Sequence, residues 1–264
     1  LDAEVLLRDA LGRDRAWLLA HIQDNFDDER RGVFERAVER RALREPLQYI
    51  TGRQEFWGLD FLVSHDVLIP RPETELIVET ALVAVPDRNK AVTIVDLCTG
   101  SGCIAVSLAR ELKSARIFAT DTSAKALDVA RENARRHGVA GRIGFLEGDL
   151  FAPLEELDIA AQVDMIVSNP PYVPQGFGSV LPPEVRDYEP AMALFAGTEG
   201  TEIHKRIIGQ APSFLKRGGL LIMEMGIGQA GALERMVRDS GVYDSLRVLK
   251  DLAGIERVIA VQKK

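Results

Sequence analysis

The residues best suited to chemistry lie directly after an apolar run that ends at Ser168: Asn169-Pro170-Pro171-Tyr172. The two prolines lack a backbone N–H and stiffen the segment, which leaves the Asn169 side-chain oxygen and the Pro170 carbonyl as paired hydrogen-bond acceptors. Such a pair suits a planar NH₂ donor, and the Tyr172 ring can stack on a flat amide or base and face a sulfonium centre. A rigid turn explains the prolines but not the asparagine and tyrosine that flank them. We therefore predict Asn169, Pro170 and Tyr172 as catalytic residues and all four as substrate-binding residues.

A second group of candidates lies in the loop Asp96-Leu97-Cys98-Thr99-Gly100-Ser101-Gly102, between an apolar run and a helical pattern. Glycine lets this backbone turn sharply and approach a ligand, and the helix N-terminus presents unpaired N–H groups. Asp121 ends the next strand pattern, 19 residues past Gly102, where a carboxylate accepts hydrogen bonds from ribose hydroxyls. Asp149 and Leu150 end a third and suit an adenine amino group and ring. The predicted cofactor-binding residues are Cys98, Thr99, Gly100, Ser101, Gly102, Asp121, Asp149, Leu150 and Asn169.

Two nucleoside cofactors fit this loop. The spacing Gly100-x-Gly102-x-x-Ala105 matches the dinucleotide fingerprint of nicotinamide dehydrogenases. Asn-Pro-Pro-Tyr has no role in hydride transfer, however, so S-adenosyl-L-methionine is the favoured cofactor. Two cysteines and four scattered histidines have no metal-ligand spacing, and we predict no metal. A non-catalytic binding module remains an alternative, but it would leave these motif residues idle.

The elements that must position these residues alternate between strand and helix from residue 91 onward. Strands are predicted at 92–97, 116–120, 142–147, 163–168, 219–224, 245–249 and 257–261, the last two close enough to pair as a hairpin. Helices are predicted at 102–113, 123–137, 199–215 and 229–240. This alternation is typical of an α/β fold, a parallel sheet covered by helices on both faces. The stretch 173–190 contains four prolines, and we predict no regular structure there, in either a loop over the substrate or a plain connector.

The region before residue 91 has a different pattern. Residues 1–50 read as a small helical domain, with an arginine-rich third helix that begins after Asp27-Asp28. Residues 51–85 read as a β-hairpin followed by a linker helix that starts near Pro72. Residues 86–264 form the predicted catalytic domain. Glu224 and the segment 71–75 are consistent both with lining the cleft and with capping or ion pairing.

Composition narrows the function classes. The chain of 264 residues carries a net charge of −7, which disfavours a general nucleic-acid coat protein because a phosphate backbone would be repelled. No apolar run approaches the roughly 20 residues that cross a bilayer, and no signal-peptide pattern opens the sequence. With two cysteines and no disulfide framework, we expect a cytoplasmic protein. We also expect that it acts as a monomer and has no membrane partner.

Three further stretches of the sequence, outside the two motifs above, match a pattern seen in known proteins. They are Glu45-Pro46-Leu47-Gln48-Tyr49-Ile50-Thr51-Gly52, Glu55-Phe56-Trp57-Gly58 and Leu68-Ile69-Pro70-Arg71-Pro72-Glu73-Thr74-Glu75. Together with the cofactor loop and Asn-Pro-Pro-Tyr, they resemble the peptide-chain release factor glutamine methyltransferases, the PrmC/HemK family of class I S-adenosylmethionine-dependent methyltransferases. The resemblance covers nearly the whole chain. One departure is Cys98, because the family usually has glycine at this position.

The resemblance implies methyl transfer to the side-chain amide of a glutamine, in the GGQ motif of a release factor. It also implies a helical domain that docks that partner, and a Rossmann-like seven-stranded sheet, mostly parallel, with an antiparallel last strand. The alternatives are a glutamine methyltransferase that acts on a ribosomal protein and a nucleic-acid amino-group methyltransferase. The net charge argues against the latter, and we expect no direct nucleic-acid substrate.

Overall fold

Capping residues set the bounds of the N-terminal helices in the computed structural model, which describes residues 1–264. The helices are α1 (Asp2–Leu11), α2 (Arg15–Ala20) and α3 (Asp28–Ala42). The carboxylates of Asp14 and Asp27 accept hydrogen bonds from backbone N–H groups at the starts of α2 and α3, and Gly12 ends α1 in a left-handed conformation. The three predicted helices are confirmed.

The hairpin and the helix that follows it pack onto the rest of the molecule. This region contains α4 (Leu47–Thr51), β1 (Arg53–Phe56), β2 (Leu59–Leu62), the 3₁₀ turn η1 (Pro72–Thr74) and α5 (Glu75–Ala84). The hairpin is confirmed as an antiparallel pair, whereas the single turn of α4 is an element that the sequence analysis missed. Phe56 and Phe61 pack edge to face beneath the hairpin, with ring centroids 6.1 Å apart. Both are fully buried in the core that α5 also covers.

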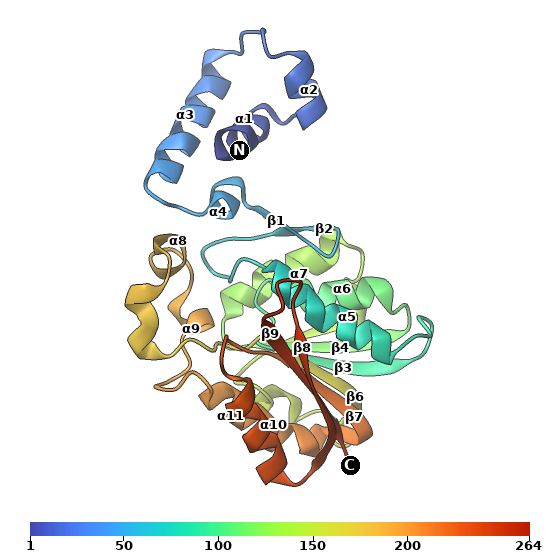
Figure 1. Ribbon diagram of the computed structural model, residues 1–264. Coiled ribbons are helices and arrows are strands. Elements are labelled where there is room, and N and C mark those ends of the chain that lie inside the picture. Colours follow the sequence, from blue (N-terminus) through green and yellow to red (C-terminus); the bar gives the residue numbers. More distant parts are fainter.

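A seven-stranded sheet forms the body of the molecule (Figure 1). Its strands are β3 (Val92–Leu97), β4 (Ala115–Asp121), β5 (Ile143–Glu147), β6 (Val163–Ser168), β7 (Leu215–Glu224), β8 (Tyr243–Lys250) and β9 (Glu256–Lys263). The strand order is β5-β4-β3-β6-β7-β9-β8. Strands β3 to β7 pair in parallel, and β9 is antiparallel to both of its neighbours. The predicted fold class is confirmed, including the antiparallel last strand.

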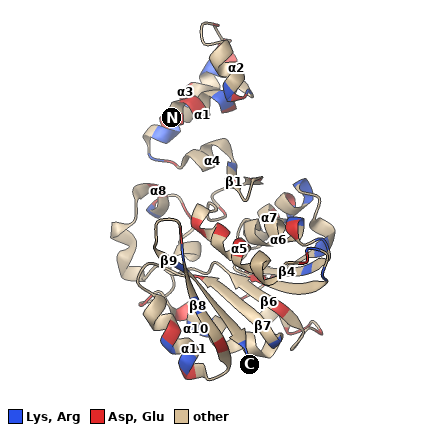
Figure 2. Cartoon of the chain, turned by 45° about the vertical axis from the view of Figure 1, so that its right-hand side comes forward, with Lys and Arg blue, Asp and Glu red and all other residues tan.

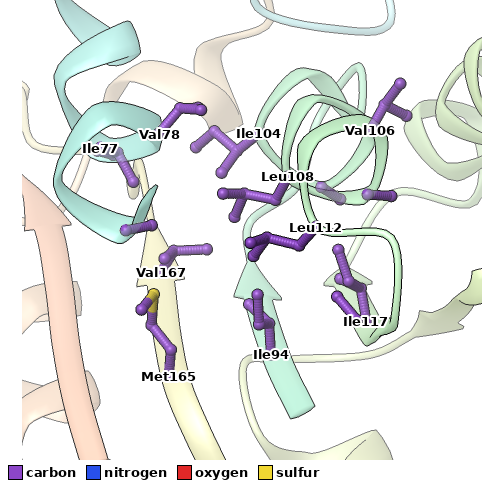
Figure 3. Close-up of a cluster of buried hydrophobic side chains, with 14 of the residues drawn as sticks. Ile77, Val78, Ile94, Ile104, Val106, Leu108, Leu112, Ile117, Met165 and Val167 are labelled. Atoms are coloured by element: carbon purple, nitrogen blue, oxygen red, sulfur yellow. The ribbon is translucent and has the colours of Figure 1, made fainter. Parts of the chain in front are cut away.

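Helices cover both faces of this sheet. They are α6 (Cys103–Glu111), α7 (Ala124–Arg136), α10 (Glu202–Phe214) and α11 (Ala230–Ser240), with short 3₁₀ turns η2 (Ala140–Arg142) and η3 (Ala152–Leu154). Successive strand residues point to opposite faces. Ile94 therefore packs with α5 and α6 in the first core cluster (Figure 3), whereas Val95 packs with α10 and α11 in the second. The sheet is buried on both faces, which keeps the loops at its strand ends in fixed positions.

The proline-rich stretch after β6 does contain regular structure, contrary to prediction. It forms the 3₁₀ helix η4 (Gln175–Val180) and two single-turn helices, α8 (Pro183–Arg186) and α9 (Ala191–Leu194). Pro182 and Pro183 begin α8, and Pro190 directly precedes α9. Proline has a φ that suits the first turn of a helix and no N–H that needs a partner there. The prolines therefore start short helices in this segment as well as limiting their length.

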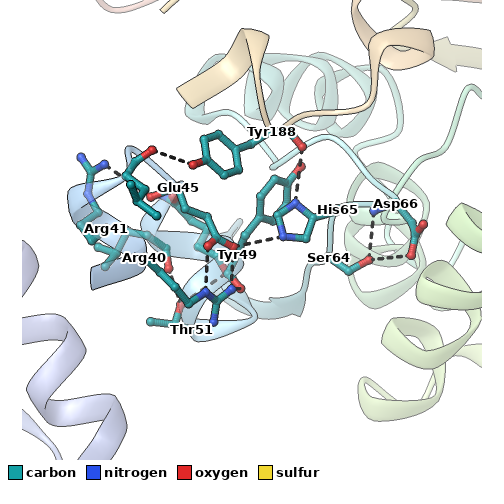
Figure 4. Close-up of polar contacts among 12 residues, drawn as sticks. Arg40, Arg41, Glu45, Tyr49, Thr51, Ser64, His65, Asp66 and Tyr188 are labelled. Atoms are coloured by element: carbon teal, nitrogen blue, oxygen red, sulfur yellow. Dashed lines mark hydrogen bonds and ion pairs between the residues drawn. The ribbon is translucent and has the colours of Figure 1, made fainter. Parts of the chain in front are cut away.

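A cluster of polar contacts joins the N-terminal region to the segment that carries α8 and α9 (Figure 4). Glu45 pairs with Arg40 at 2.6 Å and with the His65 ring at 3.1 Å. The Tyr188 hydroxyl donates to the backbone carbonyl of Leu43 at 2.6 Å. The Tyr49 hydroxyl donates to the carbonyl of Val67 at 2.6 Å, which ties α4 to the linker. These contacts fix the end of the helical region against the linker and the segment that carries α8 and α9.

Charged residues of both signs occur on the N-terminal helices (Figure 2). Most arginines of the arginine-rich helix have an acidic partner within the chain, for example Arg30 with Asp27 and Arg41 with Asp2. The helix therefore does not present an uncompensated basic face. No helix of the structure is both long enough and apolar enough to cross a membrane.

Candidate active site

The register of the sheet brings the two predicted motifs together. Leu97, the last residue of β3, pairs with Ser168, the last residue of β6, and the Ser168 hydroxyl donates to the Leu97 carbonyl at 2.8 Å. The loop that starts at Cys98 and the segment that starts at Asn169 consequently leave the sheet side by side. Between β3 and β6 the chain order of the strands also changes direction, and open α/β sheets bind ligands at such a point.

Hydrogen bonds to two aspartates shape the loop after β3. The Thr99 hydroxyl donates to Asp96 at 2.6 Å, and the backbone N–H of Gly100 donates to Asp121 at 2.9 Å. The other Asp121 oxygen accepts from the backbone N–H of Ser123 at 2.9 Å, at the start of α7. Asp121 thus holds two loops at once. Burial raises the pKa of Asp96 to about 7, and one of its carboxylate oxygens has no partner in the protein.

Cys98 adopts a left-handed backbone conformation, with a φ of 58°. This conformation costs a non-glycine residue roughly 1–2 kcal/mol, which explains why glycine suits the position in the family that the sequence resembles. The side chain lines the pocket described below. Burial raises the pKa of its thiol, which disfavours the nucleophilic thiolate form.

The third strand end contributes an apolar wall and a carboxylate. Leu150 is buried, and its carbonyl accepts a hydrogen bond from the Thr120 hydroxyl at 3.0 Å. Asp149 is exposed, and its carboxylate pairs with Arg206 of α10 at 2.5 Å. The two neighbours therefore offer different chemistry to a ligand, an apolar contact and a hydrogen-bond acceptor.

Three hydrogen bonds fix the segment Asn169-Pro170-Pro171-Tyr172, and a fourth links two of their partners. The Asn169 amide nitrogen Nδ2 donates to the Thr74 hydroxyl at 3.1 Å, which leaves the oxygen Oδ1 free to accept from a ligand. Thr74 donates in turn to Glu224 at 2.5 Å, and the Tyr172 hydroxyl donates to the other Glu224 oxygen at 3.1 Å. The Tyr172 carbonyl accepts from Gln229 at 2.9 Å. Both ends of the segment are thus fixed by hydrogen bonds, while the Asn169 oxygen accepts none within the protein and its residue lines the pocket described below.

A pocket of about 200 Å³ opens at these strand ends. The predicted residues that line it are Cys98, Thr99, Ser101, Asp121, Asp149, Leu150, Asn169 and Pro171. Gly100 and Gly102 turn the loop beneath it with φ of 54° and 79°, and a Cβ on Gly102 would approach the Cβ of Ala130 to 3.0 Å. Pro170 is buried beside the pocket, and Tyr172 directs its hydroxyl away from it toward Glu224. The functional roles of these residues stay predictions.

The pocket also contains residues that the sequence analysis did not assign. Thr74, Ile203, Met192 and Phe195 line it, so α9 and α10 complete its wall. None of the four histidines does so, and no group of three or more His, Cys, Asp or Glu side chains is arranged to hold a metal ion. The polar and apolar walls fit a nucleoside cofactor: Asp121 and Asp149 offer acceptors, Leu150 offers an apolar contact, and Asn169 lies at the mouth of the loop after β6.

Comparison with known proteins agrees with this geometry. Residues 1–52 match the family model of the PrmC N-terminal domain, and residues 74–179 match that of the methyltransferase small domain. The release factor glutamine methyltransferase of Geobacter sulfurreducens is 44% identical, over 98% of this chain and 88% of its own length. The protein of the same name from Moorella thermoacetica is 43% identical, over 100% of this chain and 91% of its own length.

Solved structures share the fold at lower identity. A methyltransferase from Pyrococcus furiosus superimposes with a TM-score of 0.56 at 16% identity, covering 86% of this chain and 98% of that one. Fold and site together define a class I S-adenosylmethionine-dependent methyltransferase. The chain belongs to the release factor glutamine methyltransferase family, as the full-length identities show.

Proposed function

We propose that this protein transfers a methyl group from S-adenosyl-L-methionine to the side-chain amide nitrogen of a glutamine in a peptide-chain release factor. The observation that carries the proposal is the Oδ1 oxygen of Asn169, a pocket residue, which accepts no hydrogen bond within the protein while its amide nitrogen is bonded to Thr74. A free acceptor at this position suits the NH₂ group of a substrate amide. The names of the full-length relatives supply the glutamine and the release factor. Because that substrate works in translation, we place the reaction in the cytoplasm.

We assign cofactor binding to the loops after β3, β4 and β5. Asp121 would accept hydrogen bonds from the ribose hydroxyls, Asp149 would accept one from the adenine amino group, and Leu150 would contact the adenine ring. Cys98, Thr99, Gly100, Ser101 and Gly102 bring their backbone close to the ligand at the N-terminus of α6. S-adenosyl-L-methionine supplies an electrophilic methyl group on a positively charged sulfur.

The substrate nitrogen needs orientation more than deprotonation. An amide nitrogen is a weak nucleophile because its lone pair is shared with the carbonyl, and no histidine lines the pocket to act as a base. We assign the two amide hydrogens to Asn169 Oδ1 and to the Pro170 carbonyl. These acceptors would concentrate electron density on the nitrogen and orient it for attack on the methyl group that the cofactor would supply. The methylated nitrogen is acidic and releases its extra proton to solvent.

The helical region of residues 1–50 is the proposed docking site for the protein substrate. Its helices lie away from the sheet (Figure 1), and their contacts run to the segment with α8 and α9, which borders the pocket. We propose the same functional division as the sequence indicates: residues 1–50 for docking, 51–85 as connection and 86–264 for catalysis.

The test is transfer of a labelled methyl group from S-adenosyl-L-methionine to four purified substrates. These are a release factor, the same release factor with its GGQ glutamine replaced by alanine, a ribosomal protein and DNA. We expect label in the release factor and none in its substituted form. Labelling of DNA alone would refute the proposed chemistry, and labelling of the ribosomal protein alone would refute the proposed substrate.

A further inference from the structure

A hydrogen-bond relay, formed by Asn169, Thr74 and Glu224, connects Asn169 to a fully buried carboxylate. Asn169 Nδ2 lies 3.1 Å from the Thr74 hydroxyl oxygen, which lies 2.5 Å from Glu224 Oε2. Glu224 is 2% exposed, at the end of β7, and Thr74 is 2% exposed, at the end of η1. The three residues come from three parts of the chain and meet behind the substrate side of the pocket. A carboxylate buried this completely is costly unless its partners are well defined.

The direction of each hydrogen bond follows from the chemistry of the groups. The Thr74 hydroxyl has one hydrogen, and the Glu224 carboxylate, when ionised, can only accept it. The Thr74 oxygen is then limited to accepting, so Asn169 must present its NH₂ group to Thr74. If the Asn169 amide were flipped, its Oδ1 oxygen would face the Thr74 hydroxyl oxygen with no hydrogen between them, and the two would repel each other. It would also turn its NH₂ toward the NH₂ of the substrate.

We propose that Thr74 and Glu224 are positioning residues, which fix the orientation of the Asn169 amide so that Oδ1 faces the substrate nitrogen. The catalytic role of Asn169 itself rests on the proposed function. Tyr172 supports the same carboxylate, because its hydroxyl donates to Glu224 Oε1 at 3.1 Å. The backbone at Glu224 is fixed as well, since the His204 ring nitrogen Nε2 donates to its carbonyl at 2.7 Å.

The first test compares Thr74→Val, which removes the hydroxyl at nearly constant volume, with Thr74→Ser, which retains it. We expect Thr74→Val to lower kcat about tenfold with unchanged cofactor affinity, and Thr74→Ser to keep kcat within about twofold of wild type. In an Asn169→Ala background, Thr74→Val should have no additional effect, because its target is gone. Equal kcat in both Thr74 variants would refute the relay. So would a loss of kcat from Thr74→Val that is as large in the Asn169→Ala background as in wild type.

A second readout does not depend on any substrate. The Asn169 side-chain amide, assigned by the resonance that Asn169→Asp removes, should exchange its hydrogens with solvent more slowly in wild type than in Thr74→Val. Equal exchange rates would overturn the relay even if methyl transfer occurs. Conversely, slow exchange in a protein that methylates no glutamine would refute the proposed function and leave the relay standing.

The relay also predicts a pH dependence. The groups that face the Glu224 carboxylate are Thr74, Tyr172, the positive charge of Arg257 and the negative charge of Glu73. Burial raises the pKa of Glu224 to about 7. Below that pH its proton can be donated to Thr74, which frees the Asn169 amide to flip. We expect wild-type kcat to fall below pH 7 and kcat of Glu224→Gln to stay constant from pH 6 to 8; the same decline in both would contradict the relay.

Discussion

The pocket and the N-terminal helices hold their polar side chains in different ways. Around the pocket, buried groups such as Asp96 and Glu224 fix their neighbours through short hydrogen bonds. Helices α2 and α3 contain no fully buried residue, and partly exposed ion pairs such as Arg44 with Glu184 tie them to the rest of the chain. The polar groups around the pocket are therefore preorganised, whereas an exposed ion pair of the helical region can break at little cost in stability.

The largest expected effect is on Asn169, at the centre of the preorganised region. Asn169→Ala removes one fixed acceptor, and losses of this kind lower kcat by about a hundredfold or more. Cofactor affinity should change little, because the loops after β3, β4 and β5 remain intact. Steady-state kinetics and equilibrium binding of the cofactor measure the two quantities.

A matched control for this variant is Asn89→Ala, in an exposed turn far from the motif in the sequence. It should retain wild-type kcat and affinity. If Asn169→Ala retained wild-type kcat like this control, preorganised acceptors would not explain methyl transfer in the pocket. The contrast drawn with the helical region would then be wrong.

A smaller effect is expected from His204, a buried residue of α10 that touches no ligand in the proposed site. Burial lowers its pKa from 6.5 to about 4. The unfolded chain therefore binds a proton below pH 6.5 while the folded protein does not until about pH 4, so its contribution to stability is complete above pH 6.5 and declines as the pH falls. Between pH 7 and 5 this linkage costs about 2 kcal/mol of unfolding free energy.

His204→Gln keeps a donor for the Glu224 carbonyl and does not titrate. Denaturant unfolding at pH 7 and 5 should show that wild type loses about 2 kcal/mol more than this variant between the two pH values. A parallel pH dependence in both proteins would mean that the interior behind the pocket is more open to water than the structure indicates.

The smallest effect is expected in the helical region. Arg44→Ala breaks the ion pair with Glu184, in which the arginine side chain is 59% exposed. Pairs of this kind contribute less than about 1 kcal/mol, so thermal unfolding should change slightly and kcat at saturating substrate should not change. A loss of kcat of tenfold or more would show that the N-terminal helices shape the pocket through α8, and that the two regions are not separable.

Local patterns in the sequence were sufficient for most of the fold. Strands β3 and β6 have the predicted bounds, because buried parallel strands are continuous apolar runs between clear turn signals. The placement of β9 between β7 and β8 depends on long-range pairing, which no local pattern records. The short helices α8 and α9 differ from the prediction because each is a single turn, too short for an apolar period, and the four prolines of 173–190 can start such turns as well as end them.

The site was predictable where it follows strand ends and less so where it depends on tertiary contact. Cys98 and Asn169 could be expected to lie close together, since parallel strands end at the same edge of the sheet. The bond between Thr74 and Glu224 joins residues 150 positions apart, and no pattern in the sequence pairs them. Capping, ion pairing and an active-site role remain equally consistent with such residues until their partners are known.

The most direct test of the account is to locate the transferred methyl group by tandem mass spectrometry of a release factor treated with the wild-type protein. The account predicts methylation of the side-chain amide nitrogen of one glutamine, and only a trace of it when Asn169→Ala is used for the same time. A methyl group on a lysine, an arginine or a hydroxyl would contradict the account, because the paired acceptors Asn169 and Pro170 are assigned to the two hydrogens of a planar amide.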